Sequence, residues 1–390
     1  MLQVDFSDTQ IAFADKSDAE LRRSHLLFSL MNYPLLVKIG TRLATLALQL
    51  RLPVEGLVKA TIYRQFCGGE DIAEARKVID KLGESGIKTI LDYGVEGKES
   101  EADFDRTAAY LSRTLEYARE DEDIHIISTK LSGLFRFALL EKVSSGEPLA
   151  KSEKEEYERG KARVDSICKA AFESGIGVHV DAEHSWIQGA IDEIAWEMSR
   201  RYNKGVPTVI NAVQLYRKGR LQFLKDSLQH ARDNDYLCAL KLVRGAYMEK
   251  ERERAREMGY PSPIHESLQE THRAYNEGLK FCIEHIGEVY VCNATHNEES
   301  CRLQAEMMQA KSLDPGHPLV ATAQLYGMSD NLSYNMAKAG FNVEKYLPYG
   351  PVREVVPYLI RRTQENTSVE GQMSRELQLI RKELRRRRGE

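Results

Sequence analysis

The chain has 390 residues, of which 42% are hydrophobic, and it carries a formal net charge of −4 at pH 7. A barrel domain needs roughly 250 residues, so the length suits one large catalytic domain with accessory helices rather than two equal domains. The slightly negative charge argues against a nucleic-acid partner and against a general attraction to anionic membranes.

The beginning of the chain predicts neither export nor membrane insertion. Residues 1–18 are acidic and lack the basic start and apolar run of a secretory signal, and they also lack the arginines of a transit peptide. No apolar stretch reaches the ~18–20 residues that a membrane-spanning helix needs. Six cysteines are present without a CxxC pair, which predicts buried thiols in a reducing compartment. We therefore expect a cytoplasmic protein.

The next part of the chain, residues 19–80, predicts helices. Apolar residues recur at helical spacing in 26–31 and again in 43–50, with prolines between and after these runs. No alternating strand pattern interrupts them. We expect an N-terminal helical arm or subdomain over residues 1–84.

From residue 88 onward, short apolar runs alternate with long amphipathic and charged segments. This alternation predicts parallel strands that are covered by helices, and eight repeats match a (β/α)8 TIM-like barrel, expected over residues 85–370. An open doubly wound sheet stays an alternative, although the GxGxxG turn of a dinucleotide-binding fold is absent after the first run. The predicted strands are 88–93, 124–131, 177–183, 208–215, 236–244, 288–294, 319–325 and 343–347.

The last segment, residues 371–390, predicts a basic helix or tail. Residues 381–388 contain one glutamate and six lysines and arginines. A solvated and partly frayed helix end is the simpler interpretation. A patch that contacts anionic lipid or a partner is the alternative.

Polar residues follow the predicted strands at their carboxyl ends. In barrels this is where active sites lie, so we expect a site built from these ends. The polar ends are Thr129 and Lys130, His179 to His184, Gln214 and Tyr216, Lys241 to Tyr247, Asn293 to Asn297, Gln324 to Met328, and Tyr346 to Gly350.

The predicted eighth helix carries Tyr358, Arg361, Arg362 and Glu365 at positions i, i+3, i+4 and i+7. This spacing puts them on one stripe of the helix. Two guanidinium groups beside a tyrosine can bind a carboxylate, because the guanidinium fork matches its two oxygens. A solvent-facing stripe of ion pairs is the competing interpretation and carries equal weight from spacing alone.

The third strand end offers His179, Asp181, Glu183 and His184, and the first three share one face because a strand repeats every two residues. Such a set can hold a divalent metal, as in a barrel hydrolase. A packed or hydrogen-bonded His179 is the stronger interpretation, because no other strand end supplies ligands in a matching pattern.

Together these motifs resemble the proline dehydrogenase (proline oxidase) family, in its single-function type. The resemblance covers residues 88–370 in the family's order and is most specific in its last motif. The matching motifs are Thr129 to Ser132, Asp181 to Glu183, Lys241 to Tyr247, Ala294 to Asn297, Gln324 to Met328, and Tyr346 to Asn366.

The resemblance implies FAD-dependent oxidation of L-proline to Δ1-pyrroline-5-carboxylate by hydride transfer to flavin N5, the first step toward glutamate. It implies that Asp181 orders the basic groups and that Lys241 or Arg244 favours the anionic reduced flavin. Lys241 stands where many bacterial relatives have arginine. The implied substrate-binding residues are Lys130, Leu325, Tyr346, Tyr358, Arg361 and Arg362. The implied FAD-binding residues are Ala182, Gln214, Lys241, Val243, Arg244, Gly245, Ala246, Thr295, His296, Asn297, Gln324 and Glu365.

The resemblance also implies a quinone electron acceptor, a possible peripheral contact with the inner face of a membrane, and a separate downstream pyrroline-5-carboxylate dehydrogenase. A tyrosine at position 346 favours proline over hydroxyproline, because the hydroxyproline-preferring branch has a small residue there. The alternatives are a flavin barrel for another cyclic imino acid, a metal-dependent barrel hydrolase, and a non-catalytic proline sensor.

Overall fold

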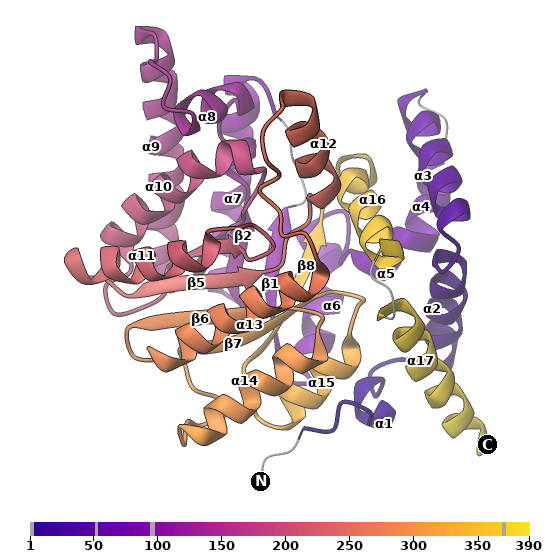
Figure 1. Ribbon diagram of the computed structural model, residues 1–390. Helices are drawn as coiled ribbons and strands as arrows, with labels where there is room; N and C mark the ends of the chain where they lie inside the picture. Colours follow the sequence, from indigo (N-terminus) through magenta and orange to yellow (C-terminus); the bar gives the residue numbers. More distant parts are fainter. Residues whose placement is uncertain (1–3, 51–53, 94–97, 369–371) are drawn as a thin grey trace. The chain divides into compact units, whose positions relative to one another are not determined.

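The computed structural model describes residues 4–50, 54–93, 98–368 and 372–390, without the side chains of residues 34, 36, 44–49, 364–368 and 372–374. Its parallel strands form a closed barrel in the order β1 to β8, so the predicted (β/α)8 fold is confirmed (Figure 1). The strands are β1 (Ile87–Tyr93), β2 (Ile124–Thr129), β3 (Gly177–Val180), β4 (Val209–Gln214), β5 (Cys238–Val243), β6 (Val289–Ala294), β7 (Val320–Leu325) and β8 (Val343–Tyr349).

Each of the eight predicted strands overlaps an observed one, and several were predicted too long at their carboxyl ends. Pairing continues one or two residues beyond the assigned strands, which explains the difference. The Asp181 N–H donates to the Thr129 carbonyl at 2.9 Å, and the Leu215 N–H donates to the Val243 carbonyl at 2.8 Å. Asp181 and Leu215 are therefore paired with the neighbouring strand at the edge where the polar side chains stand.

The chain divides into two compact units, which we call unit 1 (residues 1–95 and 323–390) and unit 2 (residues 96–322). Unit 2 contains β2 to β6, with β2–β3, β3–β4, β4–β5 and β5–β6 paired in parallel. Its helices are α7 (Glu101–Arg119), α8 (Phe137–Ser144), α9 (Lys151–Ser174), α10 (Ser185–Tyr202), α11 (Arg220–Asp233), α12 (Met248–Met258), α13 (Leu268–Glu284) and α14 (Glu298–Ala310), with a 3-10 turn at Leu131–Gly133.

Unit 1 contains the β1–β8 pair and the helices from both ends of the chain. The helices are α1 (Thr9–Ala12), α2 (Asp18–Met31), α3 (Pro34–Gln49), α4 (Glu55–Val58), α5 (Arg64–Phe66), α6 (Ile72–Gly83), α15 (Asp330–Lys338), α16 (Val352–Ser368) and α17 (Gln372–Arg388), with a π-turn at Lys59–Tyr63. The division into arm, barrel and C-terminal helix stays a prediction.

The apolar core of unit 1 joins α2, α16 and α17. Leu21, Phe28 and Met31 lie on one face of α2 and pack in the same buried cluster as Leu359 and Ile380. These helices come from opposite ends of the chain, so burial of their apolar faces accounts for their association.

The basic C-terminal helix is docked at its end rather than frayed, which corrects the simpler of the two interpretations. Glu383 is fully buried, and its carboxylate accepts hydrogen bonds from Arg386 and Arg387 at 2.8 Å. Arg387 also donates to the carbonyls of Lys16 and Phe13. The arginines on this face therefore hold α17 against the N-terminal segment.

The six cysteines are free and buried, as predicted. In the described part of the chain, none of the helices combines the length and apolarity that a bilayer crossing requires.

Unit 1 also holds a network of buried charges. The Lys345 ammonium group is 2.8 Å from an oxygen of Asp330 and donates to the Met328 carbonyl at 2.7 Å. Lys16 lies 3.5 Å from the second Asp330 oxygen. Burial and the nearby Asp330 carboxylate raise the pKa of Glu376 on α17 to about 7, while Lys345 acts in the opposite direction. Glu376 is therefore a half-buried carboxyl group of α17 that titrates near neutral pH.

We expect Glu376→Gln to raise the thermal stability of the protein at pH 8 by a few degrees and to change it little at pH 5. An unfolded glutamate titrates near pH 4.5, so between that pH and about 7 the folded chain holds a proton that the unfolded chain has lost. The free energy of unfolding of the wild type therefore falls as pH rises through this window. Melting temperatures at pH 5, 6 and 8 measure the effect.

The exposed Glu306 offers a matched control, since Glu306→Gln removes a carboxylate from the surface of α14. A stability difference for Glu376→Gln that is the same at all three pH values would contradict the assignment.

Candidate active site

The ends of the strands in unit 2 bring several predicted site residues together. His179 and Asp181 alternate with Val178 and Val180, so the two polar side chains share one face of β3. Lys241 lies within β5, and Lys130 directly follows β2. All four polar side chains are buried or nearly so. The stability of such a group depends on opposite charges lying beside one another.

Asp181 and Lys241 form a buried ion pair. The Lys241 ammonium group is 2.8 Å from Asp181 Oδ1, and the two side chains are 7% and 13% exposed. Lys130 lies 3.8 Å from Asp181 Oδ2. The carboxylate therefore stands between two lysines.

A small residue on the intervening strand leaves room for this pair. Ala212 of β4 is paired in register with Lys241. The preceding residue of β4, Asn211, is paired with Val180, so the parallel register sets Ala212 level with Asp181. Because alanine has one methyl group, the Lys241 side chain can reach across β4 to the carboxylate.

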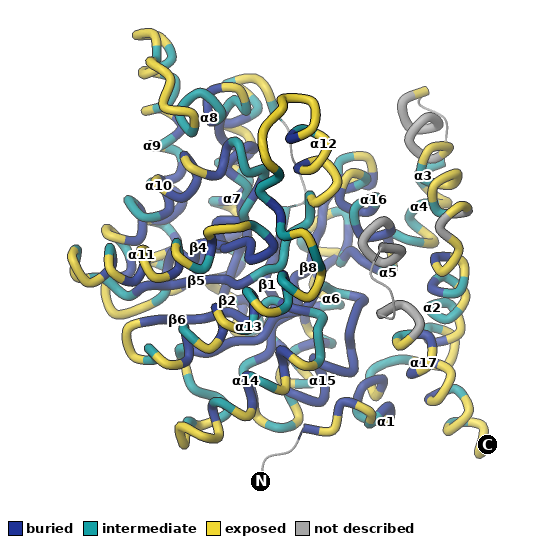
Figure 2. The backbone as a smooth tube through the Cα atoms, in the orientation of Figure 1, coloured by how far each residue is buried: buried dark blue, intermediate teal, exposed yellow. Residues whose placement is uncertain are grey.

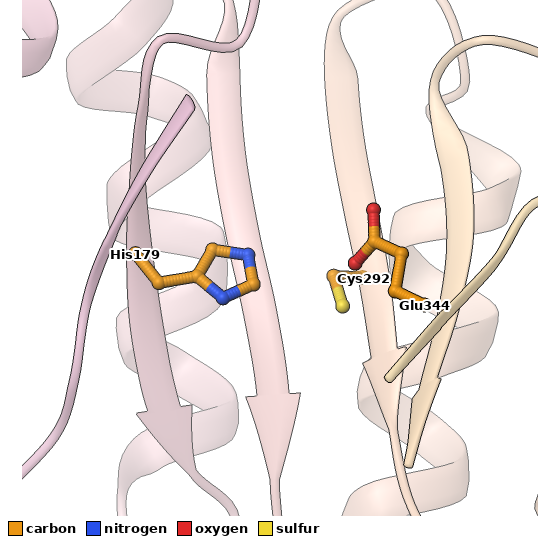
Figure 3. Close-up of side chains that lie close together, drawn as sticks. All are labelled: His179, Cys292 and Glu344. Atoms are coloured by element: carbon orange, nitrogen blue, oxygen red, sulfur yellow. The ribbon is translucent and has the colours of Figure 1, made fainter. Parts of the chain in front are cut away.

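His179 is buried in the barrel wall and neutral. It is fully buried on β3, and neither ring nitrogen has a hydrogen-bond partner in the described part of the chain. Burial first and the Lys241 charge second hold the pKa of His179 well below its usual range, against the opposing effect of Asp181. Figure 3 shows its imidazole projecting from β3. A ring nitrogen of His179 lies within 4.8 Å of the Cys292 sulfur on β6.

Glu183 and Gln214 form a second buried group. The Glu183 carboxylate accepts hydrogen bonds from the Ser132 N–H at 3.0 Å and from the Ser132 hydroxyl. The Gln214 amide nitrogen donates to the Glu183 carbonyl at 2.9 Å. The Gln214 Oε1 atom is buried and accepts no hydrogen bond within the described chain, so it is available to a donor on a bound molecule.

Arg244 follows β5 and forms hydrogen bonds with the end of β6 and with α13 and α14. Its guanidinium group donates to His272 at 2.9 Å, to Thr295 at 2.6 Å and to Ser300 at 3.0 Å. It also lies over the ring of Tyr275, with 4.1 Å between the guanidinium carbon and the ring centroid. The position of this cation is thus fixed by β6, α13 and α14.

The segment after β5 approaches the end of β4 closely. Gly245 has φ of +147°, and a Cβ added there would lie 2.3 Å from the Tyr216 ring. Only glycine fits at this position. The other predicted cofactor residues in unit 2 are Ala182, Val243, Ala246, Thr295, His296 and Asn297, of which Asn297 caps α14 by accepting from the Ser300 N–H at 2.9 Å.

Unit 1 contains the remaining predicted residues. Tyr346 is buried on β8, and Leu325 is half-buried at the end of β7. Gln324 is buried and accepts a hydrogen bond from the Ser333 hydroxyl at 2.8 Å. The side chain of Glu365 lies outside the described residues.

Two members of the predicted stripe on α16 are buried rather than exposed to solvent. Tyr358 and Arg362 are buried, and Arg361 is half-buried. The Arg362 guanidinium carbon lies 5.1 Å from the centroid of the Tyr358 ring. This places a cation and an aromatic ring together on the buried face of the helix.

The four residues of the predicted metal set have different partners in the structure. Asp181 pairs with Lys241, and Glu183 binds Ser132. The His184 ring stacks on Trp186, with 4.4 Å between ring centroids, and also contacts Tyr247. These contacts do not gather the set around one point.

Sequence reasoning missed three residues that position the site. Ser132 holds Glu183, and its place in the Thr129 to Ser132 motif was a usable signal. His272 and Ser300 hold Arg244, but they lie on helices without a local pattern that marks them.

Comparison with known proteins places the chain in a family. The sequence model of the family described as "Proline dehydrogenase" matches residues 75–375. The chain is 33% identical to "Proline dehydrogenase 2, mitochondrial" of Arabidopsis thaliana, over 99% of this chain and 91% of the relative. It is 30% identical to "Hydroxyproline dehydrogenase" of Xenopus laevis, over 98% of this chain and 90% of that relative.

A solved structure shows the same fold. The crystal structure of proline utilization A from Bdellovibrio bacteriovorus, inactivated by N-propargylglycine, superposes with a TM-score of 0.74 and 19% sequence identity. The match covers 83% of this chain and 34% of that protein, so the chain spans about a third of its length.

We expect Lys241→Met to lower the free energy of unfolding by about 3 kcal/mol, because it removes the closer lysine from the buried Asp181 carboxylate. Combining Lys241→Met with Asp181→Asn removes both charges and should restore most of the loss. Denaturant unfolding followed by fluorescence of Trp186 and Trp196 measures the four species of this double-mutant cycle. Strictly additive losses in the double variant would show that the pair is not coupled.

Proposed function

Because the chain belongs to the proline dehydrogenase family, we propose that it oxidises L-proline to Δ1-pyrroline-5-carboxylate with FAD as cofactor and passes the electrons to a quinone. The enzyme is a proline dehydrogenase; the cofactor, the route of the hydride and the electron acceptor are the proposed parts. We further propose a cytoplasmic enzyme with peripheral membrane contact, followed by a separate pyrroline-5-carboxylate dehydrogenase.

The buried group of Lys130, Asp181 and Lys241 is the observation that carries this proposal. Its two ammonium groups lie in a buried environment, where their interaction with a nearby anion is stronger than it would be in water. A substrate carboxylate or the negative edge of a reduced flavin is such an anion. The group therefore suits an anionic small molecule and a redox reaction that builds up negative charge.

The residues present fit a flavin. The isoalloxazine ring has an N–H donor between two carbonyl groups, and the buried Gln214 Oε1 is an acceptor that no described residue satisfies. Gly245 keeps the chain after β5 free of a side chain where it passes Tyr216. The residues that would hold FAD are Ala182, Gln214, Lys241, Val243, Arg244, Gly245, Ala246, Thr295, His296, Asn297, Gln324 and Glu365.

When bound, FAD supplies the hydride acceptor at its flavin N5. The proline carboxylate binds Arg361, Arg362 and Lys130. This binding fixes the position of the ring carbon that loses hydride, and so lowers the entropic cost of reaching the transition state. Tyr346, Tyr358 and Leu325 enclose the ring and exclude water.

The residues at the ends of β3 and β5 determine the electrostatics of the proposed site. Asp181 holds Lys241 in place through their 2.8 Å contact. Lys241 or Arg244 stabilises the negative charge that accumulates beside them during the reaction. The proline nitrogen reacts in its neutral form, and its proton passes to solvent.

We expect the purified protein to show flavin absorbance bands that bleach on anaerobic addition of L-proline and return when a soluble quinone is added. Oxidised NAD in place of quinone should leave the bands bleached. Bands that persist in L-proline would refute this substrate, and a protein that takes up no FAD would refute the cofactor.

We expect Tyr346→Ser to lower kcat/KM for L-proline by at least about tenfold and to lower the preference for proline over hydroxyproline, because the buried tyrosine closes the pocket around an unsubstituted ring. Steady-state kinetics with both substrates measure the ratio. Tyr346→Phe is the matched control, since it keeps the ring and should keep most of the preference. An unchanged ratio in Tyr346→Ser would remove Tyr346 as the discriminating residue.

A further inference from the structure

The segment that precedes α6 contacts the carboxyl ends of two barrel strands. We call residues 63–69 the brace; they include α5 and the two glycines that follow it. The brace, the end of β7, β8 and the start of α16 all belong to unit 1, and β8 is buried along its whole length (Figure 2). The brace forms hydrogen bonds with main-chain atoms at both strand ends.

Three of these hydrogen bonds lie at the end of β8. The Gly68 N–H donates to the Pro348 carbonyl at 2.8 Å, and the Gly350 N–H donates to the Gly69 carbonyl at 3.0 Å. The buried Tyr63 hydroxyl donates to the Gly350 carbonyl at 2.8 Å. Because α16 begins two residues later, the brace fixes the point from which that helix starts.

At the end of β7, the brace contacts the turn that follows Leu325. The Gln65 side-chain amide donates to the Gly327 carbonyl at 2.9 Å. Gly327 is buried with φ of +76°, and a Cβ added there would lie 1.9 Å from the main-chain oxygen of Gln65, so the turn lies directly against the brace. The Gln65 side chain is held in turn by the Ser24 hydroxyl, which donates to Gln65 Oε1 at 2.9 Å.

The two strand ends carry the residues that enclose the proposed substrate. Leu325 is the last residue of β7, Tyr346 lies on β8, and Tyr358 lies less than two turns from the start of α16. The Tyr326 N–H donates to the Tyr346 carbonyl at 2.9 Å, so a shift of one strand end is transmitted to the other. The positions of all three enclosing side chains therefore depend on main-chain atoms that the brace contacts.

We propose that the brace is a positioning element of the substrate pocket, in which Tyr63 and Gln65 hold the ends of β8 and β7 at the spacing that encloses a proline ring. The inference rests on the proposed function, which assigns the enclosing side chains to proline. Residues that bind a substrate need support from others that lock their geometry, because a displacement of about 1 Å weakens the fit. Tyr63 and Gln65 act through the main chain and are positioning residues.

The test compares the flavin-loaded wild type with Tyr63→Phe/Gln65→Met, which removes both side-chain donors and keeps the approximate shape of each side chain. We expect KM for L-proline to rise by about tenfold or more, since two hydrogen bonds are lost. The kcat per bound flavin should change by less than about twofold, because enclosure of the ring acts alike on bound substrate and transition state. Tyr202→Phe/Gln222→Met is the matched control, since it removes donors to carboxylates on helices of unit 2. It should keep both constants.

Hydrogen exchange followed by mass spectrometry measures the same contacts without turnover. In the brace variant, the amide N–H groups at the ends of β7 and β8, among them those of Tyr326 and Gly350, should exchange about tenfold faster than in the wild type. The amide groups of β5 should exchange at the wild-type rate.

A KM within about twofold of the wild type would overturn the proposal, even if the variant bound less flavin, because the brace would then have a structural role alone. Unchanged exchange at both strand ends would also overturn it. A wild type that binds FAD but is not reduced by L-proline would refute the proposed substrate instead. The exchange rates would then still decide whether the brace holds the two strand ends.

Discussion

The contact between Lys241 and Asp181 is the constraint on which the candidate site depends. A carboxylate buried at the end of β3 is stable only with a cation beside it, and that cation comes from β5 across the small Ala212. The same ammonium charge helps to keep His179 neutral in the barrel wall. The pair thus spans three strands and contributes to the charge of the site, so a substitution at either residue changes both the contact across β4 and the local charge.

The fold could be predicted from sequence because each strand of a covered parallel barrel is an apolar run bounded by polar residues. The positions of Lys130, Asp181 and Lys241 at strand ends followed from that pattern. The partners of Arg244 did not, because His272 and Ser300 come from helices elsewhere in the chain and carry no local signal. Spacing put Tyr358 and Arg362 on one stripe of α16, but packing decided that the stripe faces inward.

The N-terminal and C-terminal helices show a second limit of sequence patterns. Helical periodicity identifies an apolar face without saying what covers it. Leu21 and Leu26 belong to the same helix, yet the first is in the core and the second is exposed. For the basic C-terminal helix, composition predicted a frayed end, whereas the buried Glu383 binds Arg386 and Arg387 and docks the helix. One acidic residue among the arginines, Glu383, therefore holds the end of this helix in place.

Cations in this protein occur in two settings that call for different partners. The buried lysines are each held by a carboxylate, as Lys241 is by Asp181 and Lys345 by Asp330. Arg22, Lys38 and Arg42 are exposed on α2 and α3, and residues 21–54 contain no aspartate or glutamate. Water and salt screen such charges, so each of them contributes little to the stability of the fold.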